Sequence, residues 1–120
     1  MTTFLTRRAG LFVTTLALGF SAGAPAYAAG LLTAADGMTL YTFDQDTGGV
    51  PSCYDNCAVN WPPYLAKAGE TVQGLTLVPR KDGEQQWTYD GKPLYFFAGD
   101  KQKGDKTGDG RGGAWHVVPQ

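Results

Sequence analysis

The segment DGKPLYFFAGD at residues 90–100 decides how the chain is organised, because DGMTLYTFDQD at residues 36–46 repeats its pattern. Both segments read D-G-x-x-L-Y-x-F-x-x-D, and matched positions lie 54 residues apart. The same offset places Trp61 on Trp115. A period near 50 residues marks an internal repeat, and only two copies fit in a chain of 120 residues. The chain is therefore a duplicated unit.

Each copy of the pattern also carries a hairpin signal. An Asp-Gly pair separates two β-prone segments, 31–35 from 39–43 in the first copy and 85–89 from 92–97 in the second. Asp-Gly is typical of a type I′ turn, which needs a positive φ at both central residues. In the second copy, this turn would set Trp87 opposite Leu94 and Gln86 opposite Tyr95. Pro93 lacks an amide donor, which indicates an edge or a non-bonded position.

The rest of the chain predicts short strands and little helix. We expect further strands at 75–78 and 115–118, a turn at 81–83, and one helical turn at 54–58. Seventeen Gly and seven Pro interrupt the chain, and no longer window keeps an apolar period of 3.6 residues after the first 28 residues. The sequence therefore predicts an all-β fold, a small compact domain of two pseudo-symmetric β-hairpin units. It would span residues 29–120, with repeats at about 30–63 and 84–117.

The repeated strands carry large apolar side chains on both faces. Because side chains alternate along a strand, Tyr41 and Phe43 share one face, and Tyr95 and Phe97 share the matching face. The two motif leucines, at positions 40 and 94, point the other way. We therefore expect these strands to be covered on both sides.

Residues 1–28 have the pattern of a signal peptide. Arg7 and Arg8 form a basic region, 11–20 is apolar, and Ala26-Tyr27-Ala28 fits a cleavage site before Ala29. The apolar run is too short to span a bilayer, and no second run follows. The sequence thus predicts a periplasmic or secreted protein without a membrane span, exported by either the general or the twin-arginine route.

The charge balance excludes one class of partner. Removing Arg7 and Arg8 leaves eight Lys and Arg against eleven Asp and Glu, a formal net charge of −3. A protein with this balance lacks the basic surface that binds nucleic acid, so we expect no nucleic-acid partner.

The motif residues resemble those of a known family. The pattern Tyr-x-aromatic-x-x-Asp occurs at residues 41–46 and 95–100, and Trp-Pro-Pro follows at residues 61–63. In these features the chain is similar to the bacterial secreted-repeat or predicted-lipoprotein family of unknown function. The resemblance implies an exported location and a shape, and it brings no established reaction. Unlike many members, the chain has no cysteine near the cleavage site that could carry a lipid anchor.

Cys53 and Cys57 are the only cysteines. In an oxidising compartment an even number of cysteines first indicates a disulfide, and a tight turn can bring residues four apart within range. Alternatively, a C-x3-C pair with a distant histidine is the ligand set of copper chaperones, for which His116 and the softer Met38 are available. A labile or free dithiol is the third alternative.

The motif aspartates Asp46 and Asp100 have two interpretations. A carboxylate just past a strand usually accepts backbone amides of the following turn. Alternatively, the two could form an acid/base pair or a cation site across the symmetry axis. The loop 100–113 contains Asp105 and Asp109 but lacks the spacing of a calcium loop, so we expect a solvated loop or a partner-binding loop.

The remaining candidates are His116 and the aromatic residues. A lone histidine beside Trp115 is more often a hydrogen-bonded surface residue than a ligand or a base. Most aromatic side chains must fill the core, although one or two exposed rings would suit stacking on a flat ligand.

Taken together, these features favour an exported non-enzymatic binding or structural module of the cell envelope. Its partner would be an envelope component or a small ligand, and no cofactor is expected. The alternative is a periplasmic redox or copper-handling protein that uses Cys53, Cys57 and His116.

Overall fold

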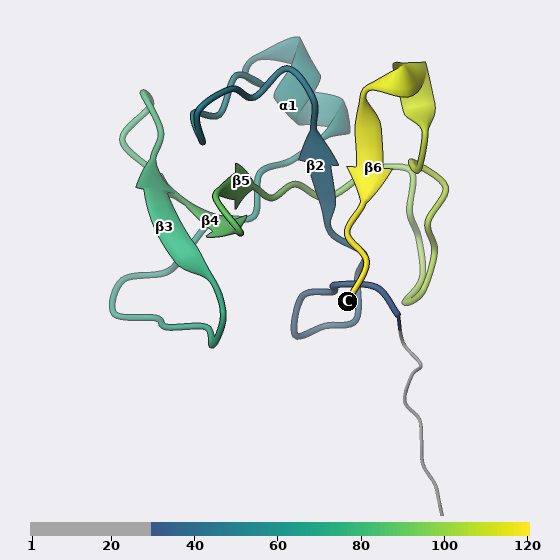
Figure 1. Ribbon diagram of the computed structural model, residues 1–120, viewed down its shortest axis with the longest axis horizontal. Helices are drawn as coiled ribbons and strands as arrows, with labels where there is room; N and C mark the ends of the chain where they lie inside the picture. Colours follow the sequence, from purple (N-terminus) through teal and green to yellow (C-terminus); the bar gives the residue numbers. More distant parts are fainter. Residues whose placement is uncertain (1–29) are drawn as a thin grey trace, which may run out of the picture. The chain divides into compact units, whose positions relative to one another are not determined.

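Five short strands form two antiparallel sheets in the computed structural model, which describes residues 30–120 (Figure 1). One sheet pairs two strands, and the other has the order β3-β4-β5. The paired strands are β2 (Tyr41–Phe43) and β6 (Trp115–Val117). The second sheet consists of β3 (Thr76–Pro79), β4 (Gln85–Tyr89) and β5 (Lys92–Pro93). The all-β prediction is confirmed, whereas the predicted signal peptide, residues 1–28, lies outside the described residues.

Helix is limited to two short segments at matching places. The helix α1 covers Asn56–Asn60, and a 3-10 turn, η2, covers Arg111–Gly113. Each ends shortly before the tryptophan of its repeat, Trp61 or Trp115. The sequence placed a helical turn at 54–58, two residues earlier than α1 begins and ends.

The Asp-Gly turn of the second repeat has the predicted form. Asp90 and Gly91 have φ angles of 53° and 77°, as a type I′ turn requires. The predicted register follows, because the Leu94 amide donates to the Trp87 carbonyl at 2.9 Å. Pro93 pairs with Thr88 on the edge strand β5, where no amide donor is needed.

The type I′ prediction is wrong for the first repeat. There the Gly37 amide donates to the Ala34 carbonyl and the Ala34 amide to the Met38 carbonyl, both at 2.9 Å. Gly37 has a φ of 87°, whereas Asp36 is not among the residues of positive φ. This arrangement is a three-residue loop that ends in a glycine bulge. The extra loop residue changes the offset between matched residues from 54 after the turn to 55 before it, since Leu32 bonds Leu40 where Trp87 bonds Leu94.

The two repeats interlock through their central strands. β2 pairs with β6 of the other repeat, and Figure 1 shows the two strands side by side. Tyr41 and Tyr95 also exchange two backbone hydrogen bonds, of 2.8 and 2.9 Å. Exchanging the repeats maps each tyrosine onto the other, so this pair lies on a pseudo-twofold axis. The bridges of Tyr41 with Val117 and of Tyr95 with Pro63 are related in the same way.

The core divides into two clusters according to the strand alternation. One cluster contains the motif leucines Leu40 and Leu94, both fully buried, together with Trp87. The other contains the motif tyrosines Tyr41 and Tyr95, also fully buried. The central strands are thus covered on both faces, as their sequence pattern predicts.

Candidate functional site

A column of four stacked aromatic rings crosses the pseudo-twofold axis. The rings follow the order Phe43, Trp115, Trp61, Phe97, with successive centroids 4.0, 3.9 and 4.4 Å apart. The two tryptophan planes are parallel to within 1°. Because the tryptophans are buried and the phenylalanines half-buried, the column has an inner part and two outer ends.

The motif tyrosines pack edge-on against this column. Tyr41 lies 5.3 Å from Trp61 at 81°, and Tyr95 lies 5.2 Å from Trp115 at 89°. Edge-to-face packing is a favoured aromatic geometry. The near-identical values show that the duplication preserves side-chain geometry as well as the motif.

Each motif aspartate holds the tyrosine of the other repeat. The Tyr41 hydroxyl donates to Asp100 Oδ2 at 2.7 Å, and the Tyr95 hydroxyl donates to Asp46 Oδ2 at 2.8 Å. Tyrosine and aspartate of one copy of the motif therefore never bond each other. The sequence contains no signal for this exchange, because the spacing within the motif is equally compatible with a bond inside each repeat.

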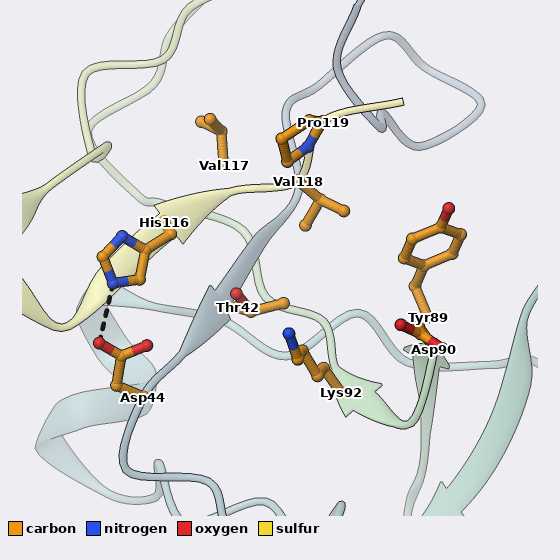
Figure 2. Close-up of a pocket in the computed structure, with 9 residues that line it drawn as sticks. All are labelled: Thr42, Asp44, Tyr89, Asp90, Lys92, His116, Val117, Val118 and Pro119. Carbon is orange, nitrogen blue, oxygen red and sulfur yellow. Dashed lines mark hydrogen bonds and ion pairs between the residues drawn. The ribbon is translucent and has the colours of Figure 1, made fainter.

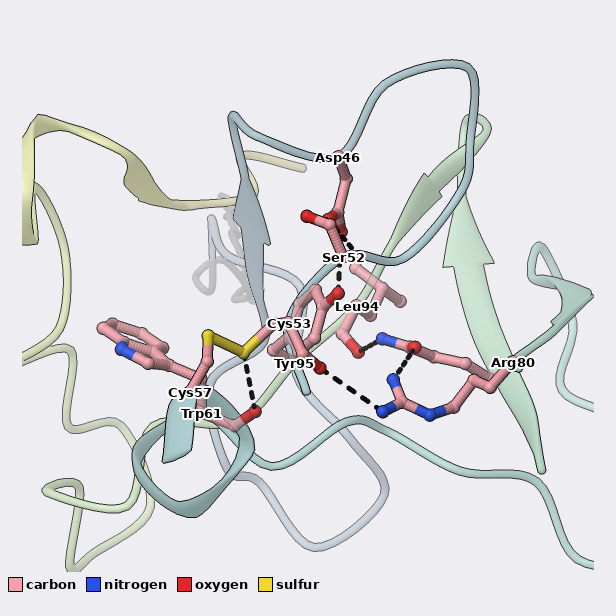
Figure 3. Close-up of a disulfide and its surroundings, with 9 residues drawn as sticks. Asp46, Ser52, Cys53, Cys57, Trp61, Arg80, Leu94 and Tyr95 are labelled. Carbon is pink, nitrogen blue, oxygen red and sulfur yellow. Dashed lines mark hydrogen bonds between the residues drawn. A yellow bond between two sulfur atoms is a disulfide. The ribbon is translucent and has the colours of Figure 1, made fainter. Parts of the chain in front are cut away.

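The second oxygen of each aspartate closes the loop that follows it. Asp46 Oδ1 accepts the backbone amide and the hydroxyl of Ser52, both at 2.7 Å (Figure 3). Asp100 Oδ1 accepts the amide of Thr107 at 3.0 Å and its hydroxyl. The carboxylates thus accept backbone amides, but six or seven residues away rather than in the next turn. Neither motif carboxylate has an oxygen without a hydrogen-bond donor.

Burial raises the pKa of Tyr41 and of Tyr95 above the ordinary value, and the bond from each hydroxyl to its aspartate raises it further. Both phenols therefore stay protonated well above neutral pH. A phenol that is buried, protonated and bonded to a carboxylate positions the chain; it is not poised to act as a base or nucleophile.

Cys53 and Cys57 form a disulfide, with their Cα atoms 5.2 Å apart (Figure 3). Cys53 is fully buried, and Cys57 is half-buried. At the matching positions the second repeat has Gly108 and Gly112. A Cβ atom on Gly108 would lie 2.7 Å from the Trp61 ring, so the aromatic column leaves no room for a second disulfide.

A buried arginine fixes the disulfide loop to the second sheet. Arg80 is 5% exposed and donates to the Cys53 carbonyl at 3.3 Å and to the Gln86 side chain at 2.7 Å. Gln86, also buried, donates in turn to the Leu94 carbonyl at 2.7 Å (Figure 3). Asp82 accepts from Arg80 at 3.1 Å. Sequence reasoning missed this network, because nothing in the pattern marks Arg80 as buried.

The lone histidine lies on the rim of an open groove of about 340 Å³ (Figure 2). His116 Nε2 is 2.8 Å from Asp44 Oδ2, and about half of each side chain is exposed. Figure 2 shows Tyr89 and Asp90 on the opposite rim. The groove is lined by Thr42, Asp44, Tyr89, Asp90, Lys92, His116, Val117, Val118 and Pro119. Both repeats therefore contribute to it.

The pseudo-twofold axis relates this groove to a second one of about 330 Å³. The second groove is lined by Ala34, Ala35, Asp36, Tyr64, Leu65, Lys67, Glu70 and Phe96. Phe96 stands where the first groove has Thr42, and Pro62 and Ala98 match His116 and Asp44. The same backbone hollow thus carries an exposed His–Asp pair on one side of the molecule only.

The predicted copper ligands do not come together. Within residues 30–120, no three His, Cys, Asp or Glu side chains form a group that could hold a metal ion. Both sulfurs of Cys53 and Cys57 are bonded to each other, and His116 faces Asp44. The remaining candidate, Met38, lies in the first turn, where its amide bonds Asp36.

The carboxylates of the loop 100–113 serve its own backbone. Asp105 Oδ2 accepts the amides of Lys101 and Gln102, at 2.9 and 3.0 Å. Asp109 Oδ1 accepts the amide of Val117 at 3.1 Å. In the part of the chain that the structure describes, no helix is long and apolar enough to cross a membrane.

The sequence profile of one protein family matches both repeats. This family is described as a secreted repeat of unknown function, and its profile matches residues 28–64 and 76–119. The two matched segments contain both copies of the motif and together cover more than half of the chain. No curated protein and no solved structure matches the chain.

Proposed function

Because this chain belongs to the family of secreted repeats of unknown function, we propose that it is an exported, non-enzymatic binding module of the cell envelope. The groove between the His116–Asp44 pair and the β4–β5 turn carries this proposal. It is open, it is built by both repeats, and it gathers exposed charges of both signs.

The motif residues support binding rather than catalysis. Catalysis needs a reactive group that is free to exchange a proton or to attack a substrate. Tyr41 and Tyr95 are instead buried and bonded to the motif aspartates, which hold backbone amides as well. These groups maintain the interlocked fold, and the exposed polar groups are left for recognition.

The lining of the groove indicates the class of ligand. Asp44 and Asp90 supply negative charge, whereas Lys92 supplies positive charge and Tyr89 an amphipathic wall. A pocket of about 340 Å³ is of the size that holds a small molecule. The groove suits a short peptide or amino sugar that carries both charge signs, a chemistry that cell-wall polymers offer.

Co-sedimentation with purified cell-wall sacculi tests this function. We expect the mature protein to be retained, and the double change Lys92→Ala with His116→Ala to reduce retention strongly. The matched control is Lys67→Ala with Glu70→Ala, which removes two charges from the related groove and leaves His116 in place. Equal loss in both variants would show that net charge, not this groove, governs retention, and would contradict the proposal.

The alternative function, redox or copper handling, has one supporting observation. Cys57 is half-buried, so a reductant could reach the disulfide and release two thiolates, which are preferred ligands of Cu(I). Titration of the reduced protein with Cu(I) against a competing chelator separates the alternatives. Tight one-to-one binding that weakens in His116→Ala would favour copper handling.

The binding-module proposal expects a different result from the same samples. Protein recovered after export should contain no free thiol and begin at Ala29 by intact-mass analysis. Reduction should only lower stability, by about 2 kcal/mol in the chain-entropy model for a loop of about five residues. Retention of Arg7 and Arg8 in the recovered protein would contradict export by signal cleavage.

A further inference from the structure

The two ends of the aromatic column are occupied differently. At the Phe97 end, the Arg111 guanidinium lies over the ring, with Cζ 4.8 Å from the centroid. Arg111 Nε also donates to the Thr107 carbonyl at 3.2 Å. A planar cation that stacks on an aromatic face and donates to a carbonyl is a favourable arrangement for arginine. The second repeat thus covers its end of the column with its own side chain.

At the other end, no cation of residues 30–120 lies over Phe43, since their cation–π contacts involve only Tyr54 and Phe97. Asn56 matches Arg111 in the first repeat and has no guanidinium to place on the ring. A hollow of about 480 Å³ lies there instead, lined by Phe43, Gln45, Ser52 and Cys57. In the second repeat, a hollow of about 410 Å³ contains Arg111 itself.

The hollow keeps the other parts of the arginine site. Phe43 matches Phe97 as the terminal ring and stacks on Trp115 almost in parallel, at 9°. Ser52 matches Thr107, whose carbonyl accepts from the guanidinium, and each bonds its motif aspartate in the same way. The ring and a carbonyl are therefore in place, and the cation is what the first repeat lacks.

The surrounding charge favours a cation at this end. Residues 30–63 contain four aspartates and no lysine, arginine or glutamate. Residues 84–117 contain five acidic and five basic residues, so they are balanced. A concentrated negative charge attracts cations toward this surface. Asp44 and Asp55, both exposed, flank the hollow in the sequence.

We propose that the outer face of Phe43 binds the guanidinium group of an arginine side chain from a partner peptide, in the position that Arg111 occupies on Phe97. The second repeat would then contain, within the same chain, a copy of the complex that the first repeat forms with a partner. This site is separate from the groove of the proposed function, because Thr42 and Asp44 line that groove and Phe43 lies on the opposite face of β2.

A peptide titration followed by nuclear magnetic resonance tests the proposal. The probe is an N-acetylated and C-amidated Gly-Arg-Gly tripeptide, and the comparison peptide replaces arginine with lysine. We expect saturable binding of the arginine peptide at one site, with shifted signals at Phe43, Gln45 and Ser52. Failure to saturate, or equally tight binding of the lysine peptide, would overturn the guanidinium site.

Two variants copy each end of the column onto the other. Asn56→Arg supplies the missing guanidinium, so the protein should occupy its own site and bind the peptide about tenfold more weakly. Asn56→Ala is the matched control and should bind as the unchanged protein does. Arg111→Asn should expose Phe97 and raise the stoichiometry from one peptide to two. Unchanged binding by Asn56→Arg, with its fold intact by the same spectra, would overturn the proposal; loss of sacculus binding alone would not.

Discussion

The two repeats agree where they touch each other and differ where they face outward. Both supply a tyrosine, an aspartate, a phenylalanine and a tryptophan to the interlocked centre, in near-identical geometry. Only the first has a disulfide, and only the second has an arginine over its terminal ring. The difference teaches that the motif is a fold requirement: each contact across the axis is made twice, so both copies need the same residues.

The largest effect should come from the centre of the column. Trp61→Ala and Trp115→Ala each remove a buried ring, and we expect each to lower the free energy of unfolding by about 3–5 kcal/mol. Because the two rings stack at 3.9 Å, the double variant should cost less than the sum. Urea denaturation measures all three.

The control for these changes is Val59→Ala, which alters a residue that is 69% exposed and should stay within about 0.5 kcal/mol. If one tryptophan proved several times more costly than the other, the symmetry of the centre would be structural appearance without energetic equality.

Alkaline pH should weaken both repeats together. Tyr41 and Tyr95 have pKa values raised above the model value of 10.0, by burial first and then by the bonds to their aspartates. The folded state therefore holds these protons more tightly than the unfolded state. Their stabilising contribution is complete below pH 10 and is lost as the pH rises from there toward the raised values, by about 1.4 kcal/mol per pH unit for each tyrosine.

Urea denaturation across a pH series checks this slope, and the Tyr41→Phe with Tyr95→Phe double variant should flatten it. A phenol that ionises near pH 10 in the folded protein, seen by ultraviolet absorbance, would contradict the buried bond to its aspartate.

The motif aspartates should reveal the first asymmetry. Asp100 is 6% exposed and Asp46 is half-buried. Asp100→Ala leaves the Tyr41 hydroxyl and the Thr107 amide without their acceptor, which we expect to cost about 1–3 kcal/mol. Water can replace part of the bonding that Asp46→Ala removes, so that cost should be smaller.

Thermal or urea unfolding compares the two, with Glu84→Ala as an exposed control. If Asp46→Ala left stability unchanged but abolished binding to sacculi or to the arginine peptide, the functional interpretation of that aspartate would replace the structural one.

Much of the fold could be predicted because its signals are local or periodic. The Asp90-Gly91 turn, the alternation around Tyr95 and the 54-residue repeat all lie in the sequence itself. The interlocking could not be predicted, because a constant offset does not say whether Tyr41 bonds within its own repeat or across the axis. The turn at Asp36-Gly37 was predicted wrongly because one extra loop residue allows a bulged turn with the same two letters.

The candidate sites were less accessible from sequence. Arg80 looks like any surface cation, and the groove at His116 depends on β2, β6 and the β4–β5 turn meeting in space. The cation site depends on comparing Asn56 with Arg111, a pair that sequence alignment alone gives no reason to single out. Contacts between distant segments decide these features, and such contacts leave no periodic pattern.

The smallest predicted effect concerns the two turn glycines. Gly37 and Gly91 have φ angles of 87° and 77°, so alanine at either position should cost about 1–2 kcal/mol of backbone strain. A Cβ on Gly91 would meet nothing within 4 Å, whereas one on Gly37 would lie 2.9 Å from the Lys103 side chain. Lys103 is exposed and flexible, so Gly37→Ala should cost only a few tenths of a kcal/mol more. Adding Lys103→Ala to Gly37→Ala should remove that excess in urea denaturation. If the excess remained, the bulged turn itself, rather than its contact with the loop of the second repeat, would set the difference between the hairpins.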